Sequence, residues 1–441
     1  MSNDLQALRP VFIDDEKQFG EILSKVLSPS RPLQTQEYLR GREEQIKDIR
    51  RALYQDGRHV FIHGYRGVGK TSLAQTVAHL LQDSEAEPII VGCGEGMKFS
   101  DTILEVMRKG LGENPQVSKQ LKERTLDASG GIKGLMGGGV ESRKAEELIR
   151  IAPPKTVNEA VSLMQHLVGV HSKKPIVLID EFDKITSHAE QEHFADFIKQ
   201  VSDQHVSMHL IFCGIGDTID SLMKAHKSVN RYLHPVKLQR LDWEPRFEIV
   251  ESAAKALGIE IDRTSTLRIC RISDGFPHYI HLIAEKLFWI VFEEKSNGKV
   301  LPRQFQTALN KASDALDPEL KIPYEKATKK YNDIYEEVLF AAADKHELQR
   351  PSKDIFTSYI RITGQLNKEP LSRQAFNGCL NRLKTPAHAE MLLATRTGWY
   401  EFKEKILRGY ARLRAEQKGI ELEVEHPAQP QKFAYRGAVT R

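Results

Sequence analysis

The nine residues Gly64-Tyr65-Arg66-Gly67-Val68-Gly69-Lys70-Thr71-Ser72 constrain this chain more than any other stretch. They match the pattern G-x-x-x-x-G-K-[ST] and lie between an apolar run, 59–63, and a helical pattern that begins at Leu73. In such a strand–loop–helix setting, backbone N–H groups wrap a polyphosphate, and the helix N-terminus adds its positive dipole end. We therefore expect all nine residues to bind a nucleotide, with Lys70 on its β- and γ-phosphates and the Thr71 hydroxyl on Mg²⁺.

Two acids follow a second apolar run. Residues 176–179 are apolar and lead directly into Asp180 and Glu181. In a parallel sheet the carboxyl end of such a buried strand lies beside the phosphate loop. We expect Asp180 to hold Mg²⁺ and Glu181 to polarise an attacking water as general base.

The order of the remaining elements predicts the fold class. Strand patterns at 88–92 and 208–214, and a segment at 228–238 that runs from a helix end into the last core strand, alternate with helical patterns. This order predicts an α/β fold: a P-loop NTPase three-layer αβα parallel sheet. The pattern loosens over about 97–155, where six glycines fall within 129–139. We interpret this segment as a flexible insertion; a loop that contacts a partner or a DNA backbone is the alternative.

Composition narrows the class of protein. A chain of 441 residues needs more than one core, and a net charge of +4 only weakly favours an anionic partner. The four cysteines form no C-x-x-C pair, and no signal peptide or membrane-spanning apolar run is present. We expect a cytoplasmic protein that does not contact a membrane.

Five segments together resemble the AAA+/STAND P-loop ATPases, most closely the origin-recognition-like (initiator-type) ATPases with a C-terminal winged helix. The resemblance covers roughly 38–290 and extends to about 415. It implies a P-loop ATPase core at 38–238, a helical lid at 239–317 and a winged-helix domain at 320–415, with an N-terminal arm at 1–37 and a disordered tail at 416–441. It also implies slow hydrolysis of ATP to ADP with Mg²⁺. The segments are Leu39-Arg40-Gly41-Arg42-Glu43, the phosphate loop, Leu178-Ile179-Asp180-Glu181, Ser228-x-x-Arg231 and Gly275-Phe276-Pro277-His278-Tyr279.

The resemblance assigns further roles. The region of Arg42 would lie near the adenine, and Pro277 beside the nucleotide. Arg231 matches an arginine finger that completes a neighbouring subunit's site in an ATP-state homo-oligomer; reading the nucleotide of its own subunit, or capping a helix end, are the alternatives. His278 stands where initiator-type members carry a sensor arginine, and it would either donate to a phosphate or simply start a helix. Cys213 stands where a polar sensor is usual; the nearby Asp217 and Thr218 are possible substitutes. Both departures lower the expected turnover.

The C-terminal module is basic. Residues 321–418 carry 19 Lys+Arg against 12 Asp+Glu. Helices are expected at about 326–345, 351–363 and 371–384, followed by a hairpin with Arg396 at its tip. Double-stranded DNA would bind through 371–396; a protein partner, or a winged helix used only for internal packing, are the alternatives. On the third helix, the side chains expected to point away from the core are those of Arg373, Gln374, Asn377, Asn381 and Lys384.

These observations favour an AAA+ molecular switch that binds and hydrolyses ATP, assembles with the nucleotide and binds DNA or a protein through the winged helix. The alternative is a STAND-type, slow nucleotide-gated signalling or defence scaffold that does not bind DNA. A kinase and a helicase fit less well, because the Asp180-Glu181 pair suits water attack and no second phosphate-loop-like core domain follows.

Overall fold

The computed structural model describes residues 12–28, 39–82, 86–112, 152–225, 229–329 and 333–423. The chain forms two compact units. The core unit contains residues 32–65 and 69–239, and the C-terminal unit contains 240–441 together with 1–31 and 66–68. The glycine-rich run at 129–139 lies outside the described residues.

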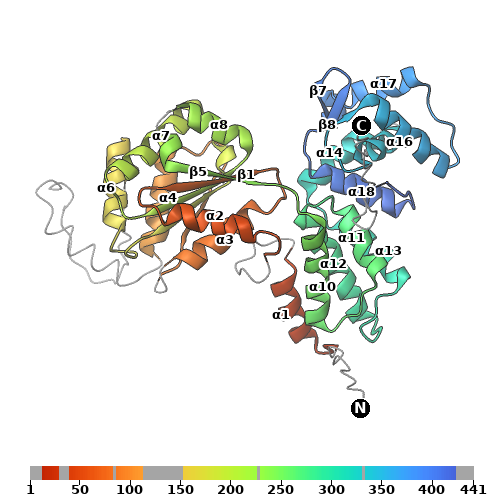
Figure 1. Cartoon of the computed structure of the whole chain (residues 1–441), viewed down its shortest axis with the longest axis horizontal. Helices are drawn as coiled ribbons and strands as arrows, with labels where there is room; N and C mark the ends of the chain where they lie inside the picture. The colour runs from red at the N-terminus through yellow and green to blue at the C-terminus, as the bar shows by residue number, and fades with distance from the viewer. Residues whose placement is uncertain are drawn as a thin grey trace, which may run out of the picture. The chain divides into compact units, whose positions relative to one another are not determined.

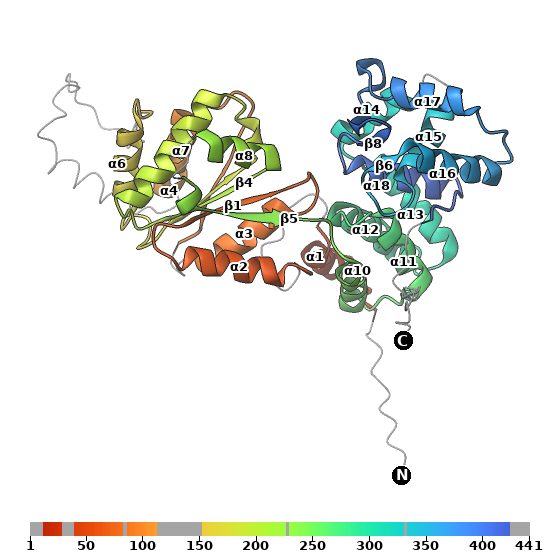
Figure 2. The ribbon, with the colours of Figure 1, turned by 45° about the horizontal axis from the view of Figure 1, so that its top comes forward.

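A five-stranded sheet in the order β2-β3-β4-β1-β5 organises the core unit, and every pair of strands in it is parallel. Helices α2 (Glu43–Leu53) and α3 (Lys70–Leu81) cover one face, and α7 (His188–Asp203) and α8 (Gly216–Ala225) cover the other (Figures 1 and 2). The expected three-layer αβα sheet is confirmed. Its strands are β1 (His59–Gly64), β2 (Ile89–Gly92), β3 (Ile176–Asp180), β4 (His209–Gly214) and β5 (Leu233–Leu238).

The register brings the ends of three strands to one edge of the sheet. Phe212 pairs with Ile179 on one side and with Phe61 on the other, so Asp180 and Gly64 both lie at the carboxyl edge. Among the described residues, β5 pairs in this sheet with β1 alone, which makes it an edge strand, and it contains Pro235. Proline is tolerated at an edge because it has no N–H to donate to a ladder.

Buried aromatic rings fill the space between the sheet and α7. The Phe182 ring packs edge-to-face on Phe194 at 4.9 Å and on Phe212 at 5.3 Å between centroids. Such arrangements are favourable for aromatic pairs beyond the area they bury. Since Phe182 directly follows Glu181, this packing anchors the acidic turn after β3.

Three further helices, α4, α6 and α9, belong to this unit. α4 (Phe99–Gly112) is regular, although the pattern was expected to loosen from about 97. Its apolar face buries Ile103, Val106 and Met107, so the helix is held by packing. α6 (Val157–Leu167) begins at Thr156, whose side chain accepts a hydrogen bond from the Glu159 N–H. The short α9 (Val229–Tyr232) leads into β5.

The first half of the C-terminal unit is helical. It contains α10 (Trp243–Leu257), α11 (Arg263–Ile272), α12 (Pro277–Glu293) and α13 (Pro302–Asp314). The arm expected at 1–37 contains a helix, α1 (Glu16–Val26), that was not predicted from the sequence. Phe19 of α1 packs on Trp289 and Phe292 of α12, with centroids 5.2 and 4.5 Å away.

The second half has the element order expected of a winged helix. After α14 (Pro318–Thr328), α15 (Ile334–Ala343) precedes β6 (Arg350–Pro351), and α16 (Ser352–Gln365) and α17 (Arg373–Arg382) precede β7 (Leu392–Arg396) and β8 (Trp399–Phe402). The strands pair antiparallel in the order β6-β8-β7. α18 (Leu407–Gln417) ends the described fold. The prediction of a single helix at 326–345 is wrong. Two helices cover this range: α14 follows its cap residue Asp317, and α15 follows its cap residue Asp333.

No helix within the described ranges combines the length and the apolar character that crossing a bilayer requires.

Candidate nucleotide-binding site

The phosphate loop begins where β1 approaches β5 most closely. A Cβ on Gly64 would lie 2.4 Å from the Leu238 carbonyl oxygen, which no side chain could tolerate. At its other end, Gly69 has φ 95° and caps α3, a left-handed conformation that glycine adopts at little cost. The two glycines therefore fix the path of the loop from the strand to the helix N-terminus.

Lys70 is folded over the loop. Its Nζ donates to the carbonyl oxygens of Gly64 and Tyr65, each at 3.1 Å. These bonds hold the ammonium on the loop that it is expected to share with the phosphates. A charged phosphate is a stronger acceptor than a neutral carbonyl, so the same ammonium can transfer to it.

Thr71 and Asp180 meet at the sheet edge. The Thr71 hydroxyl donates to the Asp180 carboxylate, and the Glu181 N–H donates to Asp180 Oδ1 at 2.8 Å. Burial raises the pKa of Asp180, and these two hydrogen bonds act in the opposite direction. A hydroxyl and a carboxylate are the hard oxygen donors that Mg²⁺ prefers, so the pair fits this ion. The described residues contain no group of three or more His, Cys, Asp or Glu that could hold a metal ion.

Glu181 has an unusual backbone. Its φ is 54° and ψ 36°, a left-handed conformation that is uncommon for residues other than glycine. The turn that follows is the 3₁₀ helix η2 (Phe182–Lys184). The side chain of Glu181 is 55% exposed, and its Oε2 lies 2.6 Å from Lys184 Nζ.

The end of β4 offers no charged group to the site. Cys213 is completely buried, and burial raises the pKa of its thiol well above the ordinary value, so it stays a neutral thiol. Thr218 is buried in α8, and the side chain of Asp217 lies outside the described ones. His63, which was not predicted to be part of the site, lies at this edge as the last residue before the loop. Burial and the charge of Lys237 lower its pKa.

The remaining expected site residues are more dispersed. Arg42 is buried, and its Nη2 donates to the Gln239 carbonyl at 2.8 Å, so its side chain fastens the end of β5. Arg231 is exposed on α9, whereas Ser228 lies outside the described residues. Pro277 and His278 are the first residues of α12 in the C-terminal unit. The roles of these residues toward a nucleotide stay predictions.

One expected outward side chain of the C-terminal module is turned inward. The Arg373 guanidinium donates to the Ser352 carbonyl and hydroxyl, both at 2.9 Å, and lies 4.7 Å over the Phe356 ring. The expectation that it points away from the core is therefore wrong. A ring and two acceptors on α16 capture the planar guanidinium. Gln374, Asn381 and Arg396 are exposed as expected.

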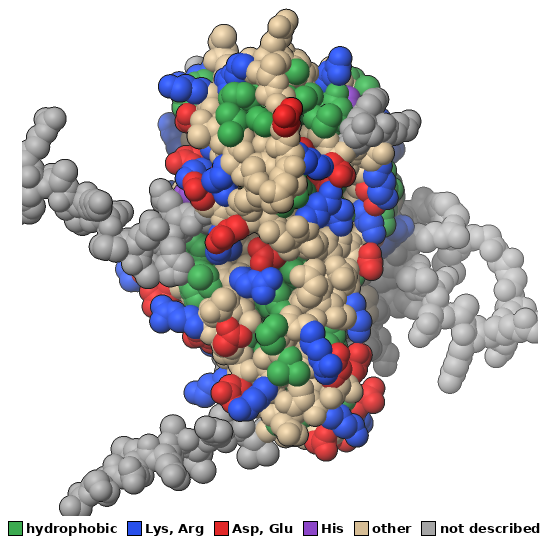
Figure 3. Space-filling view, turned by 90° about the vertical axis from the view of Figure 1, so that its right-hand side faces the viewer, with side chains coloured by type: hydrophobic (Ala, Val, Ile, Leu, Met, Phe, Trp, Pro, Cys, Tyr) green, Lys and Arg blue, Asp and Glu red, His purple; other side chains and the backbone are tan. Residues whose placement is uncertain are grey.

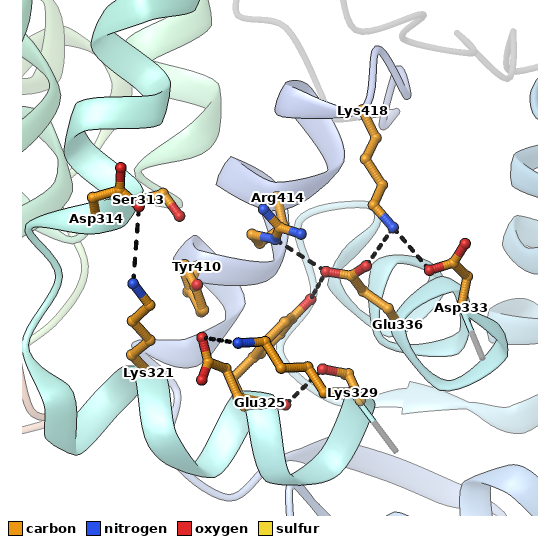
Figure 4. Close-up of a pocket in the computed structure, with 12 residues that line it drawn as sticks. Ser313, Asp314, Lys321, Glu325, Lys329, Asp333, Glu336, Tyr410, Arg414 and Lys418 are labelled. Carbon is orange, nitrogen blue, oxygen red and sulfur yellow. Dashed lines mark hydrogen bonds and ion pairs between the residues drawn. The ribbon is translucent and has the colours of Figure 1, made fainter. Parts of the chain in front are cut away.

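A separate polar cavity of about 440 Å³ lies between α13, α14, α15 and α18 (Figure 4). Its lining carboxylates and ammonium groups already pair with one another: Glu336 accepts from Arg414 at 3.1 Å and from Lys418 at 2.5 Å. Lys329 pairs with Glu325 at 2.7 Å. The contacts of Glu336 join α15 to α18 and its C-terminal end, whereas the Lys329–Glu325 pair lies along α14.

The parallel αβα sheet, the phosphate loop and the acid at the neighbouring strand end define a P-loop ATPase. The chain belongs to the family described as "ATPase domain predominantly from Archaea", whose model matches residues 39–283, more than half of the chain. The expected resemblance to this class of ATPases is confirmed. A comparison with curated protein sequences found no significant match.

Solved structures are similar to this chain at low sequence identity. A Walker-type ATPase of Pyrococcus abyssi is 15% identical with a TM-score of 0.51, over 87% of this chain and 99% of that one. Cdc6p of Pyrobaculum aerophilum is 15% identical with a TM-score of 0.45, over 92% and 100%. The ADP form of the Aeropyrum pernix ORC2 protein is 12% identical with a TM-score of 0.46, over 89% and 98%.

Proposed function

We propose that this ATPase is a molecular switch, in which ATP binding and hydrolysis in the core unit change the position of the C-terminal unit and so its binding of double-stranded DNA. In this proposal Lys70 and the loop N–H groups bind the phosphates, and Arg42 lies near the adenine. Thr71 and Asp180 would hold Mg²⁺, which screens the phosphate charge when bound. Glu181 orients the attacking water and accepts its proton.

The observation that carries the switch is a buried charge cluster within the C-terminal unit. Asp274 directly precedes the Gly275-Phe276-Pro277 loop expected beside the nucleotide, and its side chain is 1% exposed. Arg240 and Arg412 lie 2.5 and 3.1 Å from its Oδ1. Arg408 lies 3.2 Å from its Oδ2 and is itself completely buried.

These ion pairs hold α18 against Asp274, which lies in the segment between α11 and α12. Burial alone would raise the pKa of Asp274, but Arg408 and Arg412 of α18 and Arg240 hold it below its ordinary value. The carboxylate is therefore charged, and separating it from its partners would leave buried charges unpaired. A further contact ties the same parts together: the Tyr279 hydroxyl of α12 donates to the Ile406 carbonyl at 2.9 Å.

These ion pairs connect residues 275–277 through α18 to the β7–β8 hairpin. α18 follows the β7–β8 hairpin after four residues, 403–406. A displacement of the 275–277 loop by nucleotide would therefore carry α18 and the hairpin with it. Such rigid-body shifts are a common form of switching in nucleotide-binding proteins.

DNA is the partner that the exposed and half-buried polar residues of the module favour. Lys384 and Arg396 lie over the rings of Tyr400 and Trp399, at 5.5 and 3.7 Å, and the amides of Gln374 and Asn381 are exposed on α17. Cations beside amide side chains suit phosphate and base contacts. We expect these contacts to contribute only modestly to DNA binding, because basic and acidic side chains alternate over the face shown in Figure 3. In addition, the Arg373 guanidinium is already bonded to Ser352 and does not face a DNA backbone.

The direct test combines sizing with DNA binding in ADP and in ATP. Glu181→Gln should trap the ATP state, and we expect this state to form a homo-oligomer that binds duplex DNA more tightly than the ADP state. Lys384→Glu with Arg396→Glu should weaken that binding without changing ATP hydrolysis. Arg231→Ala should reduce assembly if this residue completes a neighbouring subunit's site. An unchanged mass and no DNA binding in either state would reject this function.

The inward position of Arg373 also favours a second candidate, the slow nucleotide-gated scaffold that does not bind DNA. In that case ADP would be retained through purification, turnover would be negligible, and the double variant at Lys384 and Arg396 would behave as the wild type. A protein partner would then be the ligand of the module.

A further inference from the structure

The turn after β3 places a lysine on the carboxylate that is expected to activate water. Lys184 Nζ lies 2.6 Å from Glu181 Oε2. The two residues are three apart, and the Lys184 N–H donates to the Glu181 carbonyl at 2.9 Å across one 3₁₀ turn. The turn thus brings the two charged side chains to the same side, where they form the ion pair.

The backbone around the pair is held from both directions. Glu181 has the left-handed φ of 54°, and its N–H is bonded to Asp180 Oδ1 at 2.8 Å. On the other side, the ring of Phe182 is completely buried among the aromatic rings beneath the turn. The Glu181 side chain therefore starts from a fixed point beside the candidate magnesium ligands, and Lys184 is the cation bonded to its end.

We propose that Lys184 restrains Glu181 and thereby slows ATP hydrolysis at this site. A general base must present a free lone pair within hydrogen-bond reach of the water proton it accepts. The ammonium of Lys184 occupies one carboxylate oxygen and turns the group toward itself. Glu181 must leave this ion pair before it can orient the water, so each turnover includes the cost of breaking it. Lys184 is a positioning residue that acts through Glu181.

The matched variants are Lys184→Met, Lys184→Arg and Lys174→Met. Methionine keeps the length of the side chain and removes the charge, whereas arginine keeps the ion pair. Lys174 is the control, because its ion pair with Asp56 at 3.1 Å is similarly exposed but lies before β3, at the opposite end of the strand. Both lysines are on the surface, so none of these variants should prevent folding.

We expect Lys184→Met to raise kcat about two- to fivefold, the factor expected from losing an exposed ion pair, with KM for ATP unchanged. Lys184→Arg and Lys174→Met should keep the wild-type kcat. High salt should raise kcat of the wild type at saturating ATP, but not that of Lys184→Met, because salt screens an exposed pair.

The proposal rests on the proposed role of Glu181, which Glu181→Gln tests separately. In that background, adding Lys184→Met should give no gain, because the lysine acts only through the carboxylate. A kcat of Lys184→Met at or below the wild-type value would overturn the proposal, as would an equal gain in Lys174→Met or a gain without Glu181. Full activity of Glu181→Gln would instead show that another group activates the water, and both assignments would fail together.

Discussion

At the scale of single residues, the candidate site is ordered by contacts that need no ligand. The Thr71 hydroxyl bonds to Asp180, the Glu181 N–H bonds to the same carboxylate, and Lys70 bonds to the carbonyls of its own loop. Preorganised groups of this kind lower the cost of ordering the site when substrate binds. The sequence predicted which residue types meet here, because a strand end and a phosphate loop have fixed places in a parallel sheet.

Asp180→Asn should abolish most of the ATPase activity while leaving the fold intact. An amide keeps the size and can still accept from Thr71, but it lacks the negative charge that a divalent cation requires. Metal assistance contributes several kcal/mol to phosphoryl transfer, so we expect kcat to fall on the order of 100-fold. Hydrolysis measured across a range of Mg²⁺ concentrations checks this. A loss below threefold would place the metal elsewhere.

Other residue-level features could not be predicted. The left-handed backbone of Glu181 has no signature in a non-glycine residue, so its pairing with Lys184 is visible only in the structure. Arg373 reads as an outward cation on a helix, because nothing local indicates that the Phe356 ring of another helix will cover it. Both contacts depend on the three-dimensional path of the backbone, which the spacing of residues within one helix or strand does not determine.

At the scale of elements, α18 is the helix that joins the two halves of the C-terminal unit. It brings Arg408 and Arg412 to Asp274 and meets the Tyr279 side chain of α12. A Cβ on Gly409 would lie 2.3 Å from the Tyr279 ring, which shows how near the two helices approach. The contact between α18 and Tyr279 could not be predicted from the sequence, because residues more than 120 positions apart meet there.

Asp274→Asn should destabilise the C-terminal unit strongly. The amide has the same shape, but it leaves two completely or nearly completely buried guanidinium groups without a counter-charge. Breaking a buried ion pair in this way costs about 3–5 kcal/mol. Urea unfolding monitored by tryptophan fluorescence measures the change. A cost below 1 kcal/mol would mean that the cluster does not hold the helices together.

Gly409→Ala should also destabilise, by steric overlap with the Tyr279 ring, at about 1–3 kcal/mol. Gly378→Ala is the matched control, since this glycine lies within α17 and a Cβ on it would meet nothing within 4 Å. Alanine is a better helix former than glycine, so the control should gain about 0.5–1 kcal/mol. Thermal unfolding of the two variants should therefore shift in opposite directions. A shift in the same direction would contradict the close packing of α18.

At the scale of the whole molecule, each unit has its own core, and each core encloses neutral histidines. Burial lowers the pKa of His59 to about 3 and of His209 to about 4 in the core unit, and that of His281 to about 4 in the C-terminal unit. The alternating strands and helices predicted the core unit almost entirely. In the C-terminal unit, the sequence predicted the order of the later elements but merged α14 with α15 into one helix. It also missed α1, whose packing partners Trp289 and Phe292 lie far along the chain.

Acid should therefore destabilise both units. Because these histidines have lower pKa values when folded than the ordinary 6.5, the unfolded chain binds more protons below that pH. Stability is fully present above about pH 6.5 and falls progressively toward pH 4, by roughly 1–2 kcal/mol for each histidine at pH 5. Urea midpoints at pH 7.5 and pH 5.0 measure the effect. Equal midpoints would show that these rings are solvated.

The edge position of Pro235 bears on how copies of this chain can associate. A strand added beside β5 would lie next to Pro235, which has no N–H to donate to a ladder. The sheet of one copy cannot easily be continued by the sheet of another along this border. Subunits that meet along this border are accordingly expected to associate through helices and loops, and to come apart without unfolding a strand, as a reversible switch requires.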